Sequence, residues 1–306
     1  MTPKNRIEEL RRIVQGDLLT DQPMKEYTSL KVGGPADVIV FPQDLEDLTQ
    51  IIKYLREEEI HYFVLGNGTN LLVRDGGIRD VVISLSRGFR GVEMIEADNS
   101  FFILAGASVP LVALIRFSLD HSLSGLEFAA GIPGTVGGGL IMNAGGHFGE
   151  IKDMTRSITI LNSIGEVSTE ERKDLSFSYR SLQLAMGSII VSAVFELKVG
   201  KREYIKEKVR EILIKRKETQ PLDLPNAGSI FKNPEGTSAG KLIDEAGLKG
   251  LQIGGAMVSK LHGNFILNQG NAAAKDIIRL TEKIREDVCH KSGIELQLEI
   301  EVIGEN

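Results

Sequence analysis

The sequence predicts an α+β protein with two domains. From residue 36 to about residue 197, short segments rich in Val and Ile recur between Gly or Asn turns, as strands do, and only two helical segments interrupt them. Many short strands with few helices are typical of an α+β domain rather than a regular alternation of strands and helices. At 306 residues the chain is also long enough for two separate cores.

The elements of the first domain follow from periodicity. Residues 6–15 repeat apolar side chains at helical spacing, which predicts a short helix in an N-terminal segment covering residues 1–22. Helices are also predicted over 45–58, where Asp44 is a suitable N-cap, and over 111–121. The expected strands are 37–41, 62–65, 81–85, 101–105, 158–161 and 189–197.

A charged amphipathic helix over 203–218 is expected to separate the two domains, which we predict to span residues 23–200 and 201–306. Pro221 and Pro225 end this helix. Its expected buried side consists of Tyr204, Ile205, Val209, Ile212 and Leu213. After it we expect a short helix at 239–246, a strand at 265–267 and a helix over 272–292 with Gly293 at its C-cap.

The last segment alternates cleanly between apolar and polar residues, which predicts a strand with one buried face. The apolar set is Ile294, Leu296, Leu298, Ile300 and Val302, and the polar set is Glu295, Gln297, Glu299 and Glu301.

Composition excludes several classes of partner. The net charge is −6 and Lys and Arg are interspersed with Asp and Glu, so no basic face for nucleic acid is expected. No stretch approaches the roughly 20 apolar residues of a membrane helix, and no signal peptide is recognisable, so we expect a cytoplasmic protein without membrane partners. The single cysteine excludes an internal disulfide. The sequence leaves the oligomeric state open, with a monomer as the expectation.

The densest chemical signal is the glycine block Gly131-Ile-Pro-Gly-Thr-Val-Gly-Gly-Gly-Leu-Ile-Met-Asn-Ala-Gly-Gly146. Glycine lets main-chain N–H groups converge on an anion without interference from a Cβ atom. A set of tight turns is the alternative, but Pro133, Thr135 and Asn143 add rigid and hydrogen-bonding positions that plain turns do not need. A second candidate anion-binding loop, Gly66-Asn-Gly-Thr-Asn70, directly follows the strand expected at 62–65.

Neither loop has glycines at the spacing of a dinucleotide fingerprint, because Leu71 and Met142 stand where the third glycine should be. Gly236-Thr-Ser-Ala-Gly-Lys241 is one residue short of a Walker loop. Lys241 fits a surface position and a substrate-facing position equally well. Five dispersed histidines offer no metal pair, so no metal is expected. A serine-hydrolase elbow is also missing. On the residues alone, Ser229 is favoured as a turn residue, Glu299 as one more polar residue of the last strand, and Arg180 as an ordinary arginine.

Six ordered blocks nevertheless closely resemble the UDP-N-acetylenolpyruvoylglucosamine reductase (MurB) family over nearly the whole chain, in its shorter type II form. They are residues 27–37, 65–73 and 131–146, Phe177-Ser-Tyr-Arg-Ser181, Ala227-Gly-Ser-Ile-Phe-Lys-Asn-Pro234, and the final strand ending in Ile303-Gly304. The resemblance implies an FAD-binding domain of the vanillyl-alcohol-oxidase/PCMH type and a C-terminal α+β substrate-binding domain.

The resemblance also implies site residues. Ser229 would be the proton donor, with Glu299 and Arg180 as catalytic partners, while Glu301 stands where many members of the family carry arginine. Substrate contacts are expected at Lys232, Asn233, Lys241 and His262. FAD contacts would fall on Gly66, Asn67, Gly68, Thr69, Asn70, Ile132, Pro133, Gly134, Gly137, Gly138, Asn143 and Gly145.

The implied reaction is NADPH-dependent reduction of a UDP-sugar enolpyruvyl ether through FAD, in cell-wall precursor synthesis. Two alternatives stay open on the residues themselves. One is an FAD-dependent oxidase of the same fold, and the other is a non-enzymatic nucleotide-sugar or phosphate-binding protein whose glycine loops serve only affinity.

Overall fold

The computed structural model describes residues 3–97, 100–146 and 148–306. The chain divides into two compact units, each built from separate stretches of sequence. Unit 1 comprises the chain up to Thr20 with Val38–Gly66 and Asp80–Ile214, and unit 2 comprises Asp21–Asp37, Asn67–Arg79 and Lys215–Asn306. The chain therefore passes from one unit to the other several times.

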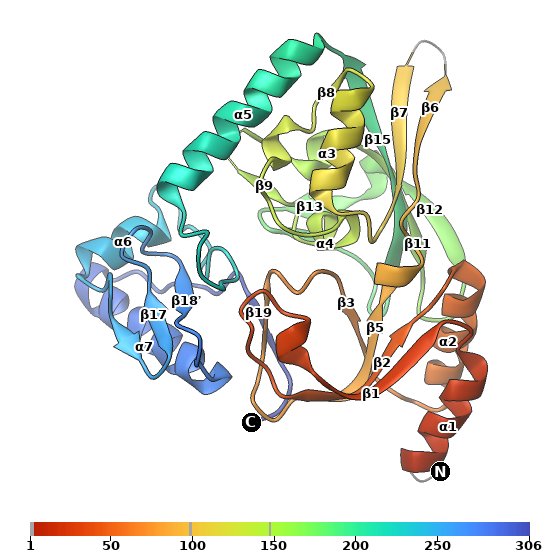
Figure 1. Cartoon of the computed structure of the whole chain (residues 1–306), viewed down its shortest axis with the longest axis horizontal. Helices are drawn as coiled ribbons and strands as arrows, with labels where there is room; N and C mark the ends of the chain where they lie inside the picture. Colours follow the sequence, from red (N-terminus) through yellow and green to blue (C-terminus); the bar gives the residue numbers. More distant parts are fainter. Residues whose placement is uncertain (1–2, 98–99, 147) are drawn as a thin grey trace. The chain divides into compact units, whose positions relative to one another are not determined.

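Unit 1 is organised around an antiparallel sheet whose central strand is β15 (Ile189–Val199). β11 (Thr155–Leu161) and β7 (Ser100–Gly106) flank it, and the three strands lie side by side in Figure 1. The outer strands are β12 (Val167–Glu171), β6 (Val92–Ala97) and the short β8 (Leu123–Ser124). β15 carries six buried residues out of eleven, and from Val191 to Leu197 they alternate with more exposed ones, as expected for a strand with one face on the core.

A second sheet has the order β1-β2-β5-β3, and three of its strands continue from one unit into the other. Its strands are β1 (Asp17–Pro23), β2 (Pro35–Phe41), β5 (Ile78–Ser84) and β3 (Tyr62–Leu65). β3 and β5 pair in parallel, with Tyr62 opposite Val81. The helices α1 (Pro3–Ile13) and α2 (Leu45–Glu57) lie against each other in unit 1.

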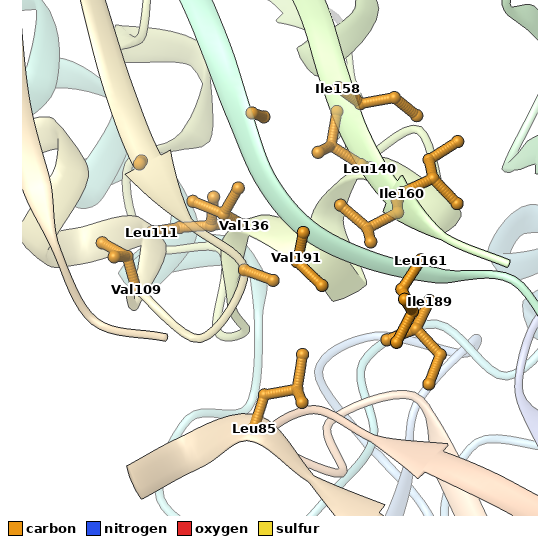
Figure 2. Close-up of a cluster of buried hydrophobic side chains, with 14 of the residues drawn as sticks. Leu85, Val109, Leu111, Val136, Leu140, Ile158, Ile160, Leu161, Ile189 and Val191 are labelled. Atoms are coloured by element: carbon orange, nitrogen blue, oxygen red, sulfur yellow. The ribbon is translucent and has the colours of Figure 1, made fainter. Parts of the chain in front are cut away.

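The core of unit 1 joins the sheets to α2, α3 (Leu111–Asp120) and α4 (Val136–Ile141). Figure 2 shows Leu111, Val136, Leu140 and Val191 within this buried cluster. From the sequence, residues 131–146 are interpreted as a glycine-rich anion-binding loop, with a set of tight turns as the alternative. The burial of Val136 and Leu140 in the core instead stabilises one and a half turns of helix in the middle of the glycine block.

Unit 2 has its own core under α6 (Ala239–Glu245) and α7 (Ala274–Ser292). A small antiparallel sheet joins β16 (Gln252–Ile253), β17 (Ala256–Val258) and β18 (Ile266–Asn268). The predicted C-cap of α7 is confirmed, because Gly293 adopts a left-handed φ of 72°. At the other end, the carboxylate of Asp75 accepts hydrogen bonds from the first main-chain N–H groups of α7, at Ala274 and Lys275.

Two sequence predictions about these elements were wrong. In α5 (Arg202–Thr219), Ile205 and Ile212 are buried, but Tyr204 is 60% exposed and Leu213 is 45% exposed. Of the five apolar residues predicted to be buried, only Ile205, Val209 and Ile212 are at least partly buried, so the apolar side of the helix is narrower than predicted. The predicted final strand is regular only over β19 (Glu301–Ile303), which pairs in parallel with β4 (Leu71–Val73).

None of the described helices is both long enough and apolar enough to cross a membrane.

We predict that Asp47→Ala destabilises unit 1 by about 3 kcal/mol. The Asp47 carboxylate is fully buried and accepts main-chain hydrogen bonds from Gln15 (3.0 Å), Gly16 (2.9 Å) and Gln43 (3.0 Å). Its removal leaves three donors without their acceptor. Urea unfolding would measure the loss. The exposed Glu46 lies in the same helical turn, and Glu46→Ala should change stability by less than about 0.5 kcal/mol; equal effects of the two variants would contradict the prediction.

Candidate active site

The helix inside the glycine block begins at a specific cap. The side chain of Thr135 is buried and its Oγ1 accepts a hydrogen bond from the main-chain N–H of Gly138 at 3.3 Å. This is the usual role of threonine at an N-cap. The rest of the first turn is hydrogen-bonded to the segment before α3: the N–H groups of Val136 and Gly137 donate to the carbonyls of Val109 and Ala107.

The Thr135 hydroxyl lies close to one glycine of each predicted anion-binding loop. A Cβ atom built on Gly66 would meet only Thr135 Oγ1, at 3.3 Å, and one built on Gly138 would meet only that atom, at 3.5 Å. Both glycines therefore border space that a side chain would fill. Such an opening, bounded by main chain and a hydroxyl, fits the pyrophosphate of a dinucleotide cofactor such as FAD.

The remainder of the second loop is fixed within unit 2. Gly68 has a left-handed φ of 60°, and a Cβ atom there would lie 2.1 Å from the carbonyl oxygen of Tyr27. The carbonyl of Gly68 accepts hydrogen bonds from the main-chain N–H and the hydroxyl of Ser29. Only glycine fits this position, for reasons of both conformation and space.

Asn143 is a buried polar residue near the end of the glycine block. Its side chain is completely buried, and its Nδ2 donates to Glu150 Oε2 at 2.9 Å and to the carbonyl of Ser178 at 3.0 Å. Lys152 forms an ion pair with the same Glu150 carboxylate. Partial burial by itself raises the pKa of Glu150. The hydrogen bonds from Lys152 and Asn143 and the charges of Lys152 and Arg180 outweigh burial and leave the pKa below its ordinary value.

Arg180 lies in the two-residue turn of a hairpin in unit 1. The hairpin consists of β13 (Ser176–Ser178) and β14 (Ser181–Gln183), with Ser178 opposite Ser181. Arg180 has a φ of 56°, which is uncommon for a residue other than glycine, and its guanidinium lies 5.0 Å from the ring centre of Tyr179.

Ser229 follows a tight turn in unit 2. Asn226 Oδ1 accepts from the N–H of Gly228 at 2.9 Å, and Gly228 has a left-handed φ of 72°. Asn226 also donates to the carbonyls of Pro221 and Leu224. The turn role that the sequence indicated for this segment is thus carried by Asn226 and Gly228, and Ser229 is left half-buried beyond it.

The chain after Ser229 pairs with the C-terminal segment. Phe231 and Leu298 form an antiparallel bridge, the N–H of Glu299 donates to the carbonyl of Ile230, and the N–H of Lys232 donates to the carbonyl of Gln297. This register brings Ser229 and Glu299 to neighbouring backbone positions.

Two asparagines hold this pairing in place. The buried Asn264 accepts from the N–H of Phe231 through Oδ1 and donates to the carbonyl of Phe231 through Nδ2, at 2.9 and 2.8 Å. Asn70, from the glycine loop, donates to the carbonyl of Glu299 at 2.9 Å. Unit 2 therefore gathers Ser229, Glu299 and part of the predicted FAD loop.

Glu301 lies two residues after Glu299. Burial raises the pKa of Glu301, although its side chain keeps contact with solvent.

The predicted substrate contacts also lie in unit 2, and three of them surround the start of α6. Asn233 Oδ1 accepts from the N–H of Ala239, the exposed Lys241 lies in the first turn of α6, and a Cβ atom on Gly240 would be 3.3 Å from His262 Cε1. Lys232 is half-buried beside the C-terminal segment.

His262 is held as a neutral donor. Burial, and to a smaller extent the charge of Lys249, lower the pKa of His262 below its ordinary value of 6.5. The N–H of Asn264 donates to His262 Nδ1 at 3.2 Å, so the proton of the neutral ring belongs on Nε2. Among the described residues, no three His, Cys, Asp or Glu side chains gather as a metal site would require, and His147 lies outside those residues.

Sequence reasoning missed Glu150 and Asn264. Asn264 gives no local signal, because its partners are 33 residues away in the chain and only the tertiary fold brings them together. Glu150 is one acidic residue among many in the sequence, and its significance comes only from Asn143, Lys152 and Arg180 around it.

Comparison with known proteins defines the class first. A family profile described as an FAD binding domain matches residues 36–170, a range that includes the whole glycine block 131–146. A second profile, described as the C-terminal domain of UDP-N-acetylenolpyruvoylglucosamine reductase, matches residues 220–303. The chain is thus an FAD-binding protein of the α+β class, as predicted, with an FAD-binding domain and a separate C-terminal domain.

Similar proteins of known name identify the family within this class. UDP-N-acetylenolpyruvoylglucosamine reductase of Syntrophus aciditrophicus is 47% identical over 300 residues, covering 98% of this chain and 96% of the relative. The protein of the same name from Caldanaerobacter subterraneus is 45% identical over 301 residues, covering 98% of both chains. The crystal structure of the Thermus caldophilus reductase (MurB) superposes with a TM-score of 0.81 at 38% identity, covering 94% of this chain and 98% of that one.

The chain therefore belongs to the UDP-N-acetylenolpyruvoylglucosamine reductase (MurB) family, which confirms the resemblance seen in the sequence. The shorter form of the family is compatible with this near-complete mutual coverage.

We predict that His262 makes stability pH-dependent just below neutrality. Because its pKa is lowered in the folded protein, the unfolded chain binds the proton more tightly. The stabilisation is fully present above the unfolded-state pKa of about 6.5 and is lost as pH falls toward the folded value. Urea unfolding between about pH 7.5 and pH 5.5 should show this loss in the wild type and not in His262→Gln. The same slope in both proteins would assign it to another group.

Proposed function

We propose that this protein reduces UDP-N-acetylenolpyruvoylglucosamine to UDP-N-acetylmuramate in the cytoplasm, with NADPH as the reductant and FAD as the cofactor, for peptidoglycan synthesis. Family membership and the match to an FAD binding domain support this function. The observation that carries it is the main-chain pairing in unit 2: the N–H of Glu299 donates to Ile230, which directly follows Ser229, and the carbonyl of Glu299 accepts from Asn70. In functional terms, residues 23–200 serve the flavin and residues 201–306 serve the substrate.

The glycine loops hold the cofactor in this proposal. When bound, FAD accepts hydride from NADPH and passes it to the enolpyruvyl double bond. Gly66 and Gly138 leave room for the pyrophosphate, Thr135 offers a hydroxyl beside it, and Gly68 keeps the second loop in its turn. The proposed contacts are Gly66, Asn67, Gly68, Thr69, Asn70, Ile132, Pro133, Gly134, Gly137, Gly138, Asn143 and Gly145.

Asn143 has a particular place among these contacts. Both hydrogens of its side-chain amide are directed at Glu150 and Ser178. We therefore assign its contribution to the main chain and to the shape of the loop.

Arg180 and Glu299 respond to the charge that the reaction creates. Hydride addition at the terminal carbon of the double bond places negative charge on the adjacent carbon and on its carboxylate. The guanidinium of Arg180 stabilises this charge, and Glu299 in its protonated form donates a hydrogen bond to it, as donors do at an oxyanion site. Such groups lower the barrier because they interact more strongly with the charged intermediate than with the substrate.

Ser229 completes the reaction by protonating the charged carbon. A hydroxyl is a weak acid, but a carbon this basic takes its proton when the donor is correctly placed. The Asn226 turn before Ser229 and the Asn264 clamp after it restrict the backbone on both sides. This restriction provides the positioning on which proton transfer depends.

The substrate-binding residues are proposed to be Lys232, Asn233, Lys241 and His262. Lysines and an amide suit the diphosphate and sugar of a nucleotide sugar. His262, neutral with its proton on Nε2, donates a hydrogen bond without adding a charge.

The paired half-reactions of the purified, FAD-loaded protein test this function, and Ser229→Ala sharpens the test. In the wild type, NADPH should bleach the flavin absorbance without oxygen, and the enolpyruvyl UDP-sugar should restore it. In Ser229→Ala, bleaching should continue, while reoxidation by the UDP-sugar should fall by at least about 100-fold because the proton donor is missing. Equal slowing of both steps would make Ser229 structural. Slow bleaching with NADPH but rapid turnover with an alcohol and oxygen would indicate an oxidase instead.

Glu299→Gln and Glu301→Gln form a matched pair on the last segment of the chain. The first should slow reoxidation about as strongly as Ser229→Ala, because it removes an acidic proton beside Ser229. The second should have a much milder effect, since Glu301 lies in β19 and pairs with Leu71 of β4, whereas the N–H of Glu299 donates to Ile230, the neighbour of Ser229. Stopped-flow absorbance would compare them. The opposite order would show that the catalytic role belongs to Glu301.

A further inference from the structure

The turn that carries Arg180 requires support from its surroundings. With a φ of 56°, Arg180 adopts the left-handed conformation, which costs a residue with a Cβ atom about 1 kcal/mol or more. The base of the hairpin is secured separately by Arg172, whose guanidinium donates to the carbonyls of Lys152 and Leu175 and packs on the ring of Phe177. These contacts hold the strands but do not include the turn itself.

Asn143 connects the turn to the glycine block. Its own φ is 40°, its side chain is completely buried, and one amide nitrogen donates both to Ser178, directly before the turn, and to Glu150. Two uncommon backbone conformations are therefore joined through a single buried amide. Strained conformations persist where surrounding contacts over-determine them, and they concentrate at functional sites.

Glu150 is the anionic centre of this group. It lies in β10 (Gly149–Glu150), which pairs with β9 (Gly145–Gly146) at the end of the glycine block. Its main-chain N–H donates to the carboxylate of Asp153. Its own carboxylate accepts a hydrogen bond from Asn143 and forms an ion pair with Lys152. Contacts therefore restrict both the main chain and the side chain of Glu150. Arg180 lies two residues after Ser178, so the Asn143 amide, which donates to both Ser178 and Glu150, brings the carboxylate near the turn of Arg180. In keeping with this geometry, the charge of Arg180 contributes to lowering the pKa of Glu150.

We propose that Glu150 is a positioning residue for Arg180: held by Asn143 and Lys152, its carboxylate orients the guanidinium that the reaction uses. This inference rests on the proposed function for its kinetic consequence but not for its structural one. A half-buried carboxylate whose donors come from fixed elements gives a long, flexible arginine side chain one preferred direction. Glu150 does not touch the reacting atoms and acts only through Arg180.

The test compares Glu150→Gln with Glu127→Gln in FAD-loaded protein. Glu127 is a matched control, because it is also half-buried in unit 1 and accepts hydrogen bonds from Ser124 Oγ and the N–H of Gly125. In Glu150→Gln, reduction by NADPH should be unchanged, while reoxidation by the enolpyruvyl UDP-sugar should slow about 10-fold to 100-fold. Combined with Arg180→Lys, Glu150→Gln should add little further slowing, because both changes act on the same guanidinium. Glu127→Gln should leave both half-reactions at wild-type rates.

A measurement without turnover separates this inference from the proposed function. The Nε–H resonance of Arg180, assigned by its loss in Arg180→Lys, should shift or broaden in Glu150→Gln and stay in place in Glu127→Gln. If the wild type failed to reduce the UDP-sugar, the function would be wrong, yet the resonance would still decide the positioning role. If Glu150→Gln did not fold, Glu150→Asp, which keeps the charge on a shorter side chain, should show a smaller change of the same kind. An unmoved resonance, or independent and additive slowing with Arg180→Lys, would overturn the inference.

Discussion

The antiparallel pairing of residues 230–232 with residues 297–299 is the interaction on which unit 2 depends. Residues 297–299 exchange main-chain hydrogen bonds with residues 230–232, which directly follow Ser229, and the carbonyl of Glu299 also accepts from the side chain of Asn70. Directly afterwards, β19 pairs in parallel with β4, which begins at the end of the glycine loop. Residues separated by about 70 and by about 230 positions are thereby held by one strand, so the site in this unit is completed only when the last residues of the chain are in place.

Because the regular elements around the site are short, side chains replace the hydrogen bonds that a longer ladder would supply. Asn264 pairs with both main-chain groups of Phe231, and Asn268 donates to the carbonyl of Leu30. In unit 1, the carboxylate of Asp47 likewise accepts hydrogen bonds from three main-chain N–H groups. A buried main-chain group without a partner is costly, so these few polar side chains permit irregular backbone where a binding site needs it. They are structural residues with functional consequences.

Within each unit, the local environment of an ionisable side chain determines the direction in which its pKa is shifted. His262 is kept neutral by burial and a nearby lysine, whereas Glu150 stays ionised because an amide and two cations compensate its burial. Glu301 lacks such partners among the causes of its shift, and its pKa is raised. Two carboxyl groups of the same chain are therefore shifted in opposite directions, which residue type alone does not predict.

Much of the fold was predictable from local pattern. The strands at 62–65 and 189–197, the helices after Asp44 and before Gly293, and the burial of Leu296 and Ile300 all follow from periodicity and caps, since these depend on neighbouring residues only. Where packing outweighed local preference, the sequence misled. The helix inside the glycine block forms because Val136 and Leu140 enter the core, and α5 buries a narrower row than its apolar residues indicate.

The candidate site divides in the same way. Glycine loops, the Asn226-Ala-Gly turn and the ordered family blocks are local features, so the sequence by itself determined the class of cofactor, the family and the identity of Ser229 as a candidate. Tertiary structure alone decided that the main chain of Glu299 pairs with Ile230, next to Ser229, and that Asn264 holds the main chain of Phe231. It also decided that Asn143 joins Glu150 to the hairpin that carries Arg180. The physical reason is that each of these relations joins distant parts of the chain through hydrogen bonds or charge, and such contacts leave no periodic trace in the sequence.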